Sequence, residues 1–250
     1  MATEYTQRFY DGQKSGSLRS AQEVVPIILD LLPCKSVVDL GCGVGTWLSV
    51  FRELGIEDIL GIDGDYVNRE MLFIPANCFM SHNLGSALHL DRTFGLAMSL
   101  EVAEHIPESY SELFVQNLVR LAPVVLFSAA IPLQGGTFHV NEQWPDYWVR
   151  RFNKYGYVAI DCLRDRLWNN SSIQPYYSQN IVVFVDKNKL DDYAKLKKEF
   201  KAPGSTVISK VHPGVWLNRV GKLQKKAISP RRKFMLWING IASKIRFSKS

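Results

Sequence analysis

The sequence predicts an α/β protein with a doubly wound, mostly parallel sheet. Between residues 21 and 186, short apolar strand candidates alternate with amphipathic helix candidates, which is the pattern of a parallel sheet covered by helices on both faces. A glycine-rich turn also follows the first strand candidate directly and precedes a helix, as at the ligand-binding switch point of such sheets. The 250 residues suffice for one large domain with an appendage.

The first half of the chain begins with a helix candidate over Ala21–Leu32, which Pro26 should break near its start. The strands that follow are short runs rich in Val, Ile and Leu, and the helices have apolar residues at helical spacing. In chain order we expect a strand at Ser36–Leu40, a helix at Thr46–Leu54, a strand at Asp58–Ile62, a short helix at Asp65–Leu72 and a weak strand at Cys78–Met80.

The second half continues the alternation and then changes direction. We expect a strand at Phe94–Leu100, an amphipathic helix at Glu108–Leu121, a buried strand at Val124–Ala130 and a helix at Asp146–Tyr155 that ends at Gly156. The β-rich runs Tyr157–Cys162 and Ile181–Asp186 suit a closing antiparallel pair, with the polar, aromatic stretch 168–180 as their connection.

Composition excludes several protein classes. Apolar residues make up 46% of the chain and charged residues 22%, as in a globular protein with a core. The chain has no basic-then-apolar signal pattern and no apolar run of about 18 residues, so we expect a cytoplasmic protein. The four cysteines are scattered without a Cys-x-x-Cys pair, so neither a disulfide framework nor a cysteine-based zinc site is predicted.

Charge is unevenly distributed along the chain. The tail from Asp186 to Ser250 holds 17 Lys and Arg against 4 Asp and Glu, whereas the rest of the chain is net acidic. We therefore predict one domain over residues 1–186, with an N-terminal lid and helix at 1–33, and a basic helical C-terminal extension over 187–250. The apolar stripe within 231–247 fits a helix packed on its own domain or on a second copy, an anionic membrane surface, or a nucleic-acid contact.

The strongest motif is Val37-Val38-Asp39-Leu40-Gly41-Cys42-Gly43-Val44-Gly45. Glycines allow close approach of a ligand, and the following helix offers unpaired N–H groups. The spacing is Gly-x-Gly-x-Gly, so the dinucleotide fingerprint is not met. Asp39 can order the turn and receive an ammonium group, but it would repel a pyrophosphate, and Asp63 ends the next strand, where a carboxylate can take ribose hydroxyls.

These motifs, together with Ser99-Leu100-Glu101-Val102-Ala103-Glu104-His105-Ile106, resemble the class I S-adenosylmethionine-dependent methyltransferases. The stretch from Gly135 to Trp148 resembles a bacterial subset of these enzymes associated with glycan and small-molecule modification. The resemblance covers about residues 1 to 185. It implies a Rossmann-like methyltransferase fold with seven strands, the last of them antiparallel, and S-adenosylmethionine as the cofactor.

The resemblance also implies roles for individual residues. The methionine part of the donor would lie against the glycine-rich turn and the end of the fourth strand, and the ribose against Asp63. Tyr10 of the N-terminal lid would cover the methyl group, and Arg19 or Ser20 would meet the methionine carboxylate. The residues expected to bind the cofactor are therefore Asp39, Gly41, Cys42, Gly43, Gly45, Asp63, Gly64, Asp65, Asn83, Glu101, Tyr10 and Ser20.

The acceptor side is expected after the fourth and fifth strands. His139 follows two glycines in an aromatic loop, and His105 follows Glu104, which suits the N-terminal charge of a helix; the two histidines are the candidate catalytic residues because imidazole removes protons near neutral pH. His139 equally suits the cap of a helix starting near Asn141. Candidate substrate contacts are Trp144, Tyr147 and Tyr176.

A metal held by Glu101, His105 and His139 is disfavoured, because the sequence has neither a dense carboxylate cluster nor His-x-x-x-His spacing. The expected function is O-methylation of a hydroxylated small molecule or glycan, including phosphorylated or nucleotide-linked ones, by a monomer or homodimer. Amino-group or nucleic-acid methylation is the first alternative, which the absence of an Asn/Asp-Pro-Pro-aromatic motif weakens. A cofactor-binding scaffold without turnover is the second alternative.

Overall fold

A computed structural model describes residues 7–200 and 209–227, and the side chains of these residues except those of 7–15 and 224–227. In this part of the chain the strands are β1 (Ser36–Leu40), β2 (Asp58–Asp63), β3 (Phe79–Ser81), β4 (Leu96–Leu100), β5 (Val124–Ser128), β6 (Tyr157–Ile160) and β7 (Val182–Asp186). They form one sheet in the order β3-β2-β1-β4-β5-β7-β6. Only β7 is antiparallel to its neighbours, which confirms the predicted fold class.

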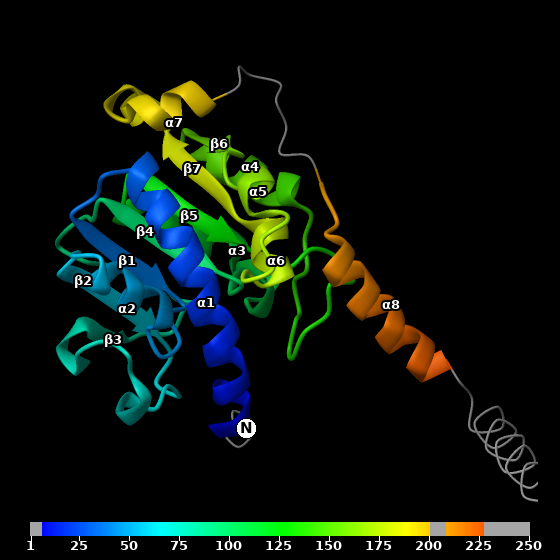
Figure 1. The fold of residues 1–250 in the computed structure, drawn as a ribbon. Helices are drawn as coiled ribbons and strands as arrows, with labels where there is room; N and C mark the ends of the chain where they lie inside the picture. Colours follow the sequence, from blue (N-terminus) through cyan, green and yellow to red (C-terminus); the bar gives the residue numbers. More distant parts are fainter. Residues whose placement is uncertain (1–6, 201–208, 228–250) are drawn as a thin grey trace, which may run out of the picture. The chain divides into compact units, whose positions relative to one another are not determined.

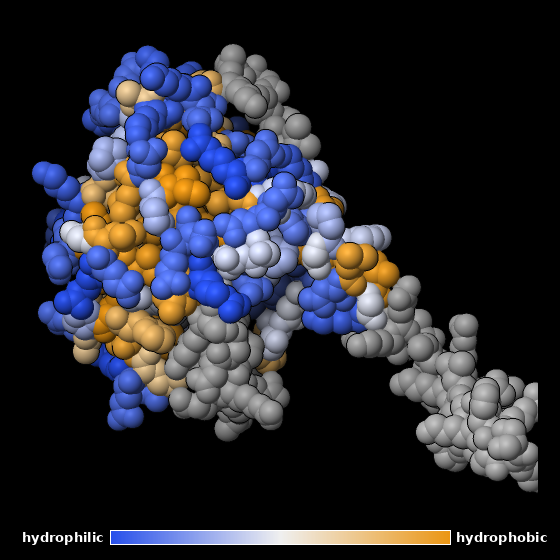
Figure 2. Space-filling model, viewed as in Figure 1, coloured by the Kyte–Doolittle hydropathy of each residue, from blue (hydrophilic) through white to orange (hydrophobic). Residues whose placement is uncertain are grey.

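Helices cover both faces of the sheet (Figure 1). The helices are α1 (Gln7–Leu31), α2 (Thr46–Glu53), α3 (Ser111–Leu121), α4 (Pro145–Lys154), α5 (Arg164–Leu167), α6 (Pro175–Asn180) and α7 (Ala194–Glu199). Residues of α1, α2, α5, α6 and α7 share one buried apolar cluster with one face of the sheet, and residues of α3 and α4 share a second cluster with the other. In the view of Figure 2, polar residues cover much of the outer surface and apolar ones show between them.

Two helices differ from the sequence-based expectation. The first helix begins at Gln7 and not at Ala21, and Pro26 lies inside it. Burial of Ala21, Val24 and Val25 against the core holds this helix together although proline removes one hydrogen bond.

The expected helix at Asp65–Leu72 is reduced to a single 3₁₀ turn at Arg69–Met71, and the prediction of an α-helix there is wrong. Only Val67 of this stretch is buried, so no apolar stripe holds a helix against the sheet. The connection at 168–180, by contrast, contains the short helix α6, whose Tyr177 packs in the core.

Contacts divide the chain into two compact units, Met1–His212 and Pro213–Ser250. The second unit contains α8 (Pro213–Ala227), which exposes Trp216 and Leu217. None of the helices in the described residues is long and apolar enough to cross a membrane. The stripe expected within 231–247 lies outside the described residues.

Candidate functional site

A cavity of about 1110 Å³ opens at the carboxyl ends of β1, β2 and β4. Most of the residues singled out in the sequence line it: Asp39, Gly41, Cys42, Gly43, Asp63, Gly64, Asp65, Asn83, Glu101, His105, His139 and Tyr176. Gly45 lies just behind the wall as the N-terminal cap of α2. The topology thus collects side chains from five separate loops at one edge of the sheet, where ligands of such sheets bind.

The glycine-rich turn needs its glycines for steric reasons at two positions. Gly41 has a φ of 94°, and a Cβ there would lie 2.4 Å from a methyl carbon of Val102. Gly45 has a φ of 79°, and its Cβ would lie 2.8 Å from the side chain of Ile74. Side chains are strained at such φ values, so the turn lies as close to the second and fourth strands as only glycine permits.

Two carboxylates lie beneath the turn. Asp39 is 4% exposed, and burial together with the nearby Asp63 carboxylate raises its pKa to about 8. Asp63 accepts hydrogen bonds from the backbone N–H groups of Gly43 (2.6 Å) and Gly64 (2.7 Å), and from the Tyr66 hydroxyl (2.5 Å). Asp63 therefore joins the glycine-rich turn to the end of β2. Ionisation of the buried Asp39 carboxyl group is unfavourable unless a cation lies beside it.

The neighbouring wall is formed by Asn83, which follows β3. The Asn83 side-chain oxygen accepts the backbone N–H of Gly85 at 3.0 Å, so the side chain closes its own turn. The side-chain amide nitrogen and the exposed Asp65 complete this wall of the cavity.

The N-terminal helix contributes one residue that the sequence did not single out. Ser20 does not line the cavity: its buried hydroxyl donates to the Gly16 carbonyl at 2.7 Å and accepts the Gln174 backbone N–H at 3.0 Å. The expected contact of Ser20 with the methionine carboxylate stays a prediction, although that face of the helix packs against the start of α6. Ser17, one helical turn earlier, lines the cavity instead. The side chain of Tyr10 lies outside the described side chains.

Glu101 is held by a network of amide groups at the end of β4. Its carboxylate accepts hydrogen bonds from Gln134 Nε2 (2.8 Å) and Asn180 Nδ2 (2.9 Å). Asn180 also donates to Gln134 Oε1, so the three side chains form a closed set. Burial raises the pKa of Glu101 to about 7 despite these hydrogen bonds. The positive φ of 56° at Glu101 is a strained backbone conformation of the kind found at functional sites.

His139 reaches the cavity from the loop after β5. Its Nδ1 lies 2.9 Å from a carboxylate oxygen of Glu142, and Glu142 is itself held by the backbone N–H groups of Leu133 and Gly135. The loop is attached to the end of β4, because the N–H groups of Val140 and Asn141 both donate to the carbonyl of Glu104.

This arrangement orients the His139 ring with Nε2 towards the cavity and Glu104. The alternative that His139 caps a helix is wrong, since α4 begins at Pro145 with Trp144 as its cap.

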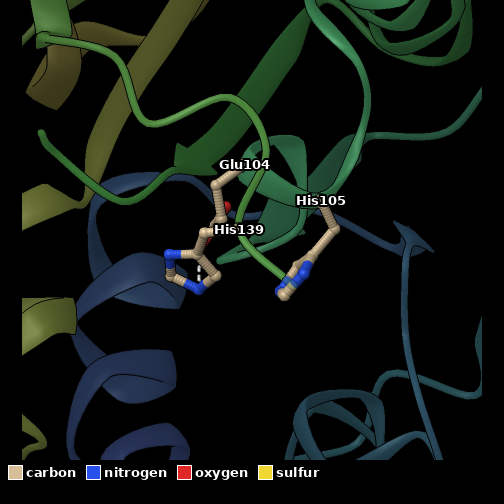
Figure 3. Close-up of side chains that lie close together, drawn as sticks. All are labelled: Glu104, His105 and His139. Carbon is tan, nitrogen blue, oxygen red and sulfur yellow. Dashed lines mark ion pairs between the residues drawn. The ribbon is translucent and has the colours of Figure 1, made fainter. Parts of the chain in front are cut away.

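Glu104, His105 and His139 form a cluster at this edge (Figure 3). Each contributes a nitrogen or oxygen atom, and these atoms lie within 4.8 Å of one another. The rings of His105 and His139 meet edge to face at 4.9 Å, and His139 Nε2 lies 4.0 Å from Glu104 Oε1.

Glu104 lies in the 3₁₀ turn Ala103–His105 and is 1% exposed, a burial that the sequence did not indicate. Burial and the nearby Glu101 raise the pKa of Glu104 well above its usual range. The backbone N–H groups of Glu104 and Ala130 approach the carboxylate, but neither completes a hydrogen bond of ordinary geometry. Among the described residues, neither carboxyl oxygen of Glu104 has a hydrogen-bond partner.

Two of the expected substrate contacts, Trp144 and Tyr147, lie outside the lining of the cavity. Tyr147 is buried in the opposite direction, where its hydroxyl donates to Ser111 Oγ at 3.1 Å, and Trp144 caps α4 at the surface. Neither lines the cavity, because α4 packs its aromatic face onto β5 and α3. Sequence reasoning missed Glu142 and Gln134, although Glu142 follows His139 by three residues in the same loop.

The comparisons with known proteins agree with this geometry. Residues 10–170 match the protein family described as a methyltransferase domain. No curated protein matches the sequence.

Solved structures with a similar fold include three at low sequence identity. The methyltransferase domain of bacterial CtHen1-C is 21% identical with a TM-score of 0.50, over 67% of this chain and 97% of that one. The sugar N-methyltransferase KedS8 from Streptoalloteichus sp. ATCC 53650 is 15% identical with a TM-score of 0.56, over 71% and 90%. DesVI from Streptomyces venezuelae is 13% identical with a TM-score of 0.52, over 71% and 94%. At these identities the likeness concerns the fold.

Proposed function

Because the chain belongs to the family of methyltransferase domains, we propose that it moves the methyl group of S-adenosylmethionine to a hydroxyl group of a small molecule or glycan. Phosphorylated and nucleotide-linked acceptors are included. The observation that carries the acceptor part of this proposal is the orientation of His139 by Glu142 at the edge of the cavity.

The donor binds in the half of the cavity under the glycine-rich turn. The methionine ammonium lies near Asp39 and Glu101, where a cation offsets the cost of charging two buried carboxyl groups. The ribose hydroxyls go to Asp63. A carboxylate has about four lone-pair sites. Three donors already bond to Asp63, so too few sites are free for both ribose hydroxyls, and the Tyr66 hydroxyl is the donor that the ribose displaces. Gly64, Asp65 and Asn83 lie alongside the adenosine.

The acceptor binds in the other half, beside His105 and His139. When Nδ1 of His139 carries the proton and donates to Glu142, Nε2 keeps a lone pair that faces the cavity. A lone pair in that position activates a hydroxyl for attack on the methyl carbon. Tyr176 and Gln134 line the wall between the two halves and offer polar groups to a hydroxylated acceptor.

The domain boundaries and the tail are part of the proposal. The methyltransferase domain lies within the unit Met1–His212, whose core includes Leu190 and Leu196 of the expected extension, and the basic residues of the tail contact an anionic partner such as a membrane surface. Loss of vesicle binding after deletion of 230–250 would support that contact, and unchanged binding would reject it.

The proposal is tested by incubating the protein with methyl-labelled S-adenosylmethionine and cell extracts separated into small metabolites, glycans, lipids and nucleic acids. Label in the metabolite or glycan fraction that survives mild alkali, as a methyl ether does and a methyl ester does not, and that mass spectrometry assigns to an O-methyl group is the expected result. Label confined to nucleic acid, or products methylated on nitrogen, would show that the proposed hydroxyl acceptor is wrong.

The His139→Ala variant distinguishes turnover from donor binding. We expect kcat to fall by about 10²–10⁴-fold while the Kd for the donor changes less than about twofold. Near-normal turnover of His139→Ala would remove His139 from the reaction. The His89→Ala variant is the matched control, because His89 is exposed and does not line the cavity.

A further inference from the structure

We propose that Glu104, His105 and His139 bind a divalent transition-metal ion at the acceptor end of the cavity. The side chains come from the 3₁₀ turn after β4 and from the loop after β5, and their ligand atoms lie within 4.8 Å of one another (Figure 3). The inference rests on the proposed function for its meaning in catalysis, but the binding of the ion is a separate property.

The first support is Glu104. It is 1% exposed and both of its oxygens lack a hydrogen-bond partner among the described residues. A buried polar group without partners costs about 1–3 kcal/mol, so such a group in a native protein calls for a ligand. The only side chain within ion-pair distance of it in the described structure is His139, at 4.0 Å, which is too long for a hydrogen bond.

The second support is the geometry of the three ligand atoms. Adjacent ligands of an ion with bonds of about 2.1 Å lie roughly 3.0–3.4 Å apart. The ligand atoms here lie within 4.8 Å of one another, so they must approach one another by up to roughly 1–2 Å to share one ion. Three protein ligands leave the remaining coordination positions of the ion facing the cavity, as in catalytic sites.

The third support is the surroundings of His139. Metal-bound histidines almost always donate a hydrogen bond from their second ring nitrogen to a carboxylate or carbonyl. Nδ1 of His139 meets Glu142 at 2.9 Å, and two backbone N–H groups fix Glu142 in turn. Gly136 makes room for the ring, because a Cβ there would lie 2.0 Å from His139 Nε2.

The donor set indicates the class of ion. Two imidazoles and one carboxylate suit Mn²⁺, Fe²⁺, Co²⁺ or Zn²⁺, whereas Mg²⁺ and Ca²⁺ prefer oxygen ligands. An ion in this position binds the acceptor hydroxyl through an open coordination site and lowers its pKa, and the released proton passes to solvent. His139 then acts as a ligand through Nε2, and the cation takes over the activation of the hydroxyl.

Glu101 does not belong to the cluster. Gln134 and Asn180 occupy its carboxylate, so the set differs from the Glu101, His105 and His139 combination that the sequence suggested. The sequence spacing could not reveal the site, because His139 lies 34 residues after His105 and meets it only through the fold.

The test uses the full chain without a histidine tag, dialysed against a chelator. Calorimetric titration with Zn²⁺ and visible absorption on addition of Co²⁺ should show one ion per chain. Glu104→Gln and His105→Ala should each weaken Zn²⁺ binding by at least about tenfold and change the Co²⁺ spectrum. His89→Ala should leave both unchanged. Binding of equal strength in wild type and Glu104→Gln, or no binding by the wild type, would overturn the proposal.

Thermal unfolding of each variant verifies that it folds, and His105 is exposed enough that its truncation preserves the core. S-adenosylmethionine binding is measured on the same samples. Intact donor binding without ion binding rejects the metal site alone, and ion binding without donor binding rejects the proposed function alone. Turnover that is unaffected by the chelator would also count against a metal at the acceptor.

Discussion

The Asp39→Asn substitution separates the stability of the protein from its affinity for the donor. Asp39 is 4% exposed, and its pKa is raised from 3.8 to about 8 by burial and by Asp63. The folded state therefore binds more protons than the unfolded chain between these two values, so the stability of the protein falls as the pH rises through them. Asparagine has nearly the same shape and carries no charge, so it removes this cost.

The size of the effect follows from the pKa values. At about 1.4 kcal/mol per pKa unit, the penalty on wild type grows by up to about 4 kcal/mol between pH 5 and pH 8. We expect the free energy of unfolding of Asp39→Asn to exceed that of wild type by an amount that increases over this range, in urea titrations of the ligand-free protein. Donor affinity should fall by about 10–100-fold, because the methionine ammonium loses a charged acceptor.

The control for this experiment is Asp91→Asn, which removes a carboxylate from an exposed position. Its difference from wild type should not depend on pH. The reasoning fails if Asp39→Asn has the same pH slope of stability as wild type, or if it binds the donor as tightly.

Three further predictions concern the donor turn and the acceptor loop. Asp63→Ala should raise the Kd for S-adenosylmethionine by about 10–100-fold with a smaller change in kcat, and an unchanged Kd in direct titration would contradict the ribose assignment. Glu142→Gln should lower kcat by about tenfold without altering the donor Kd, since it only orients the imidazole ring; equal losses in both would indicate a folding defect. Gly41→Ala should cost about 1–3 kcal/mol of stability, because of its φ of 94° and the contact of its new Cβ with Val102, and Val102→Ala should recover part of the loss in thermal unfolding.

Most residues predicted to bind the donor line the cavity, whereas two of the three predicted substrate contacts do not. The residues around Asp39 and Gly41 lie within a few positions of one another, and a strand, a turn and a helix following in sequence fix their arrangement locally. The fold class was predictable for the same reason, since the alternation of elements is visible in the chain.

The acceptor half depends on contacts between distant segments. The sequence could not show that Tyr147 and Trp144 lie outside the cavity lining, because the face that α4 turns to the sheet is decided by packing on β5 and α3. The burial of Glu104 could not be predicted either, because it depends on the loop after β5, some thirty residues later, which folds back over it. No local pattern carries that information.

The attachment of this loop has a consequence for how its sequence can vary. The backbone N–H groups of Val140 and Asn141 donate hydrogen bonds to the carbonyl of Glu104, so these two bonds do not depend on which side chains the two residues carry. Exposed side chains of the loop, such as those of Thr137 and Val140, can therefore change without releasing the loop, while the glycine-rich turn on the other strands is untouched. The wall beside His139 can thus take a different shape and polarity without any change in the glycine-rich turn across the cavity.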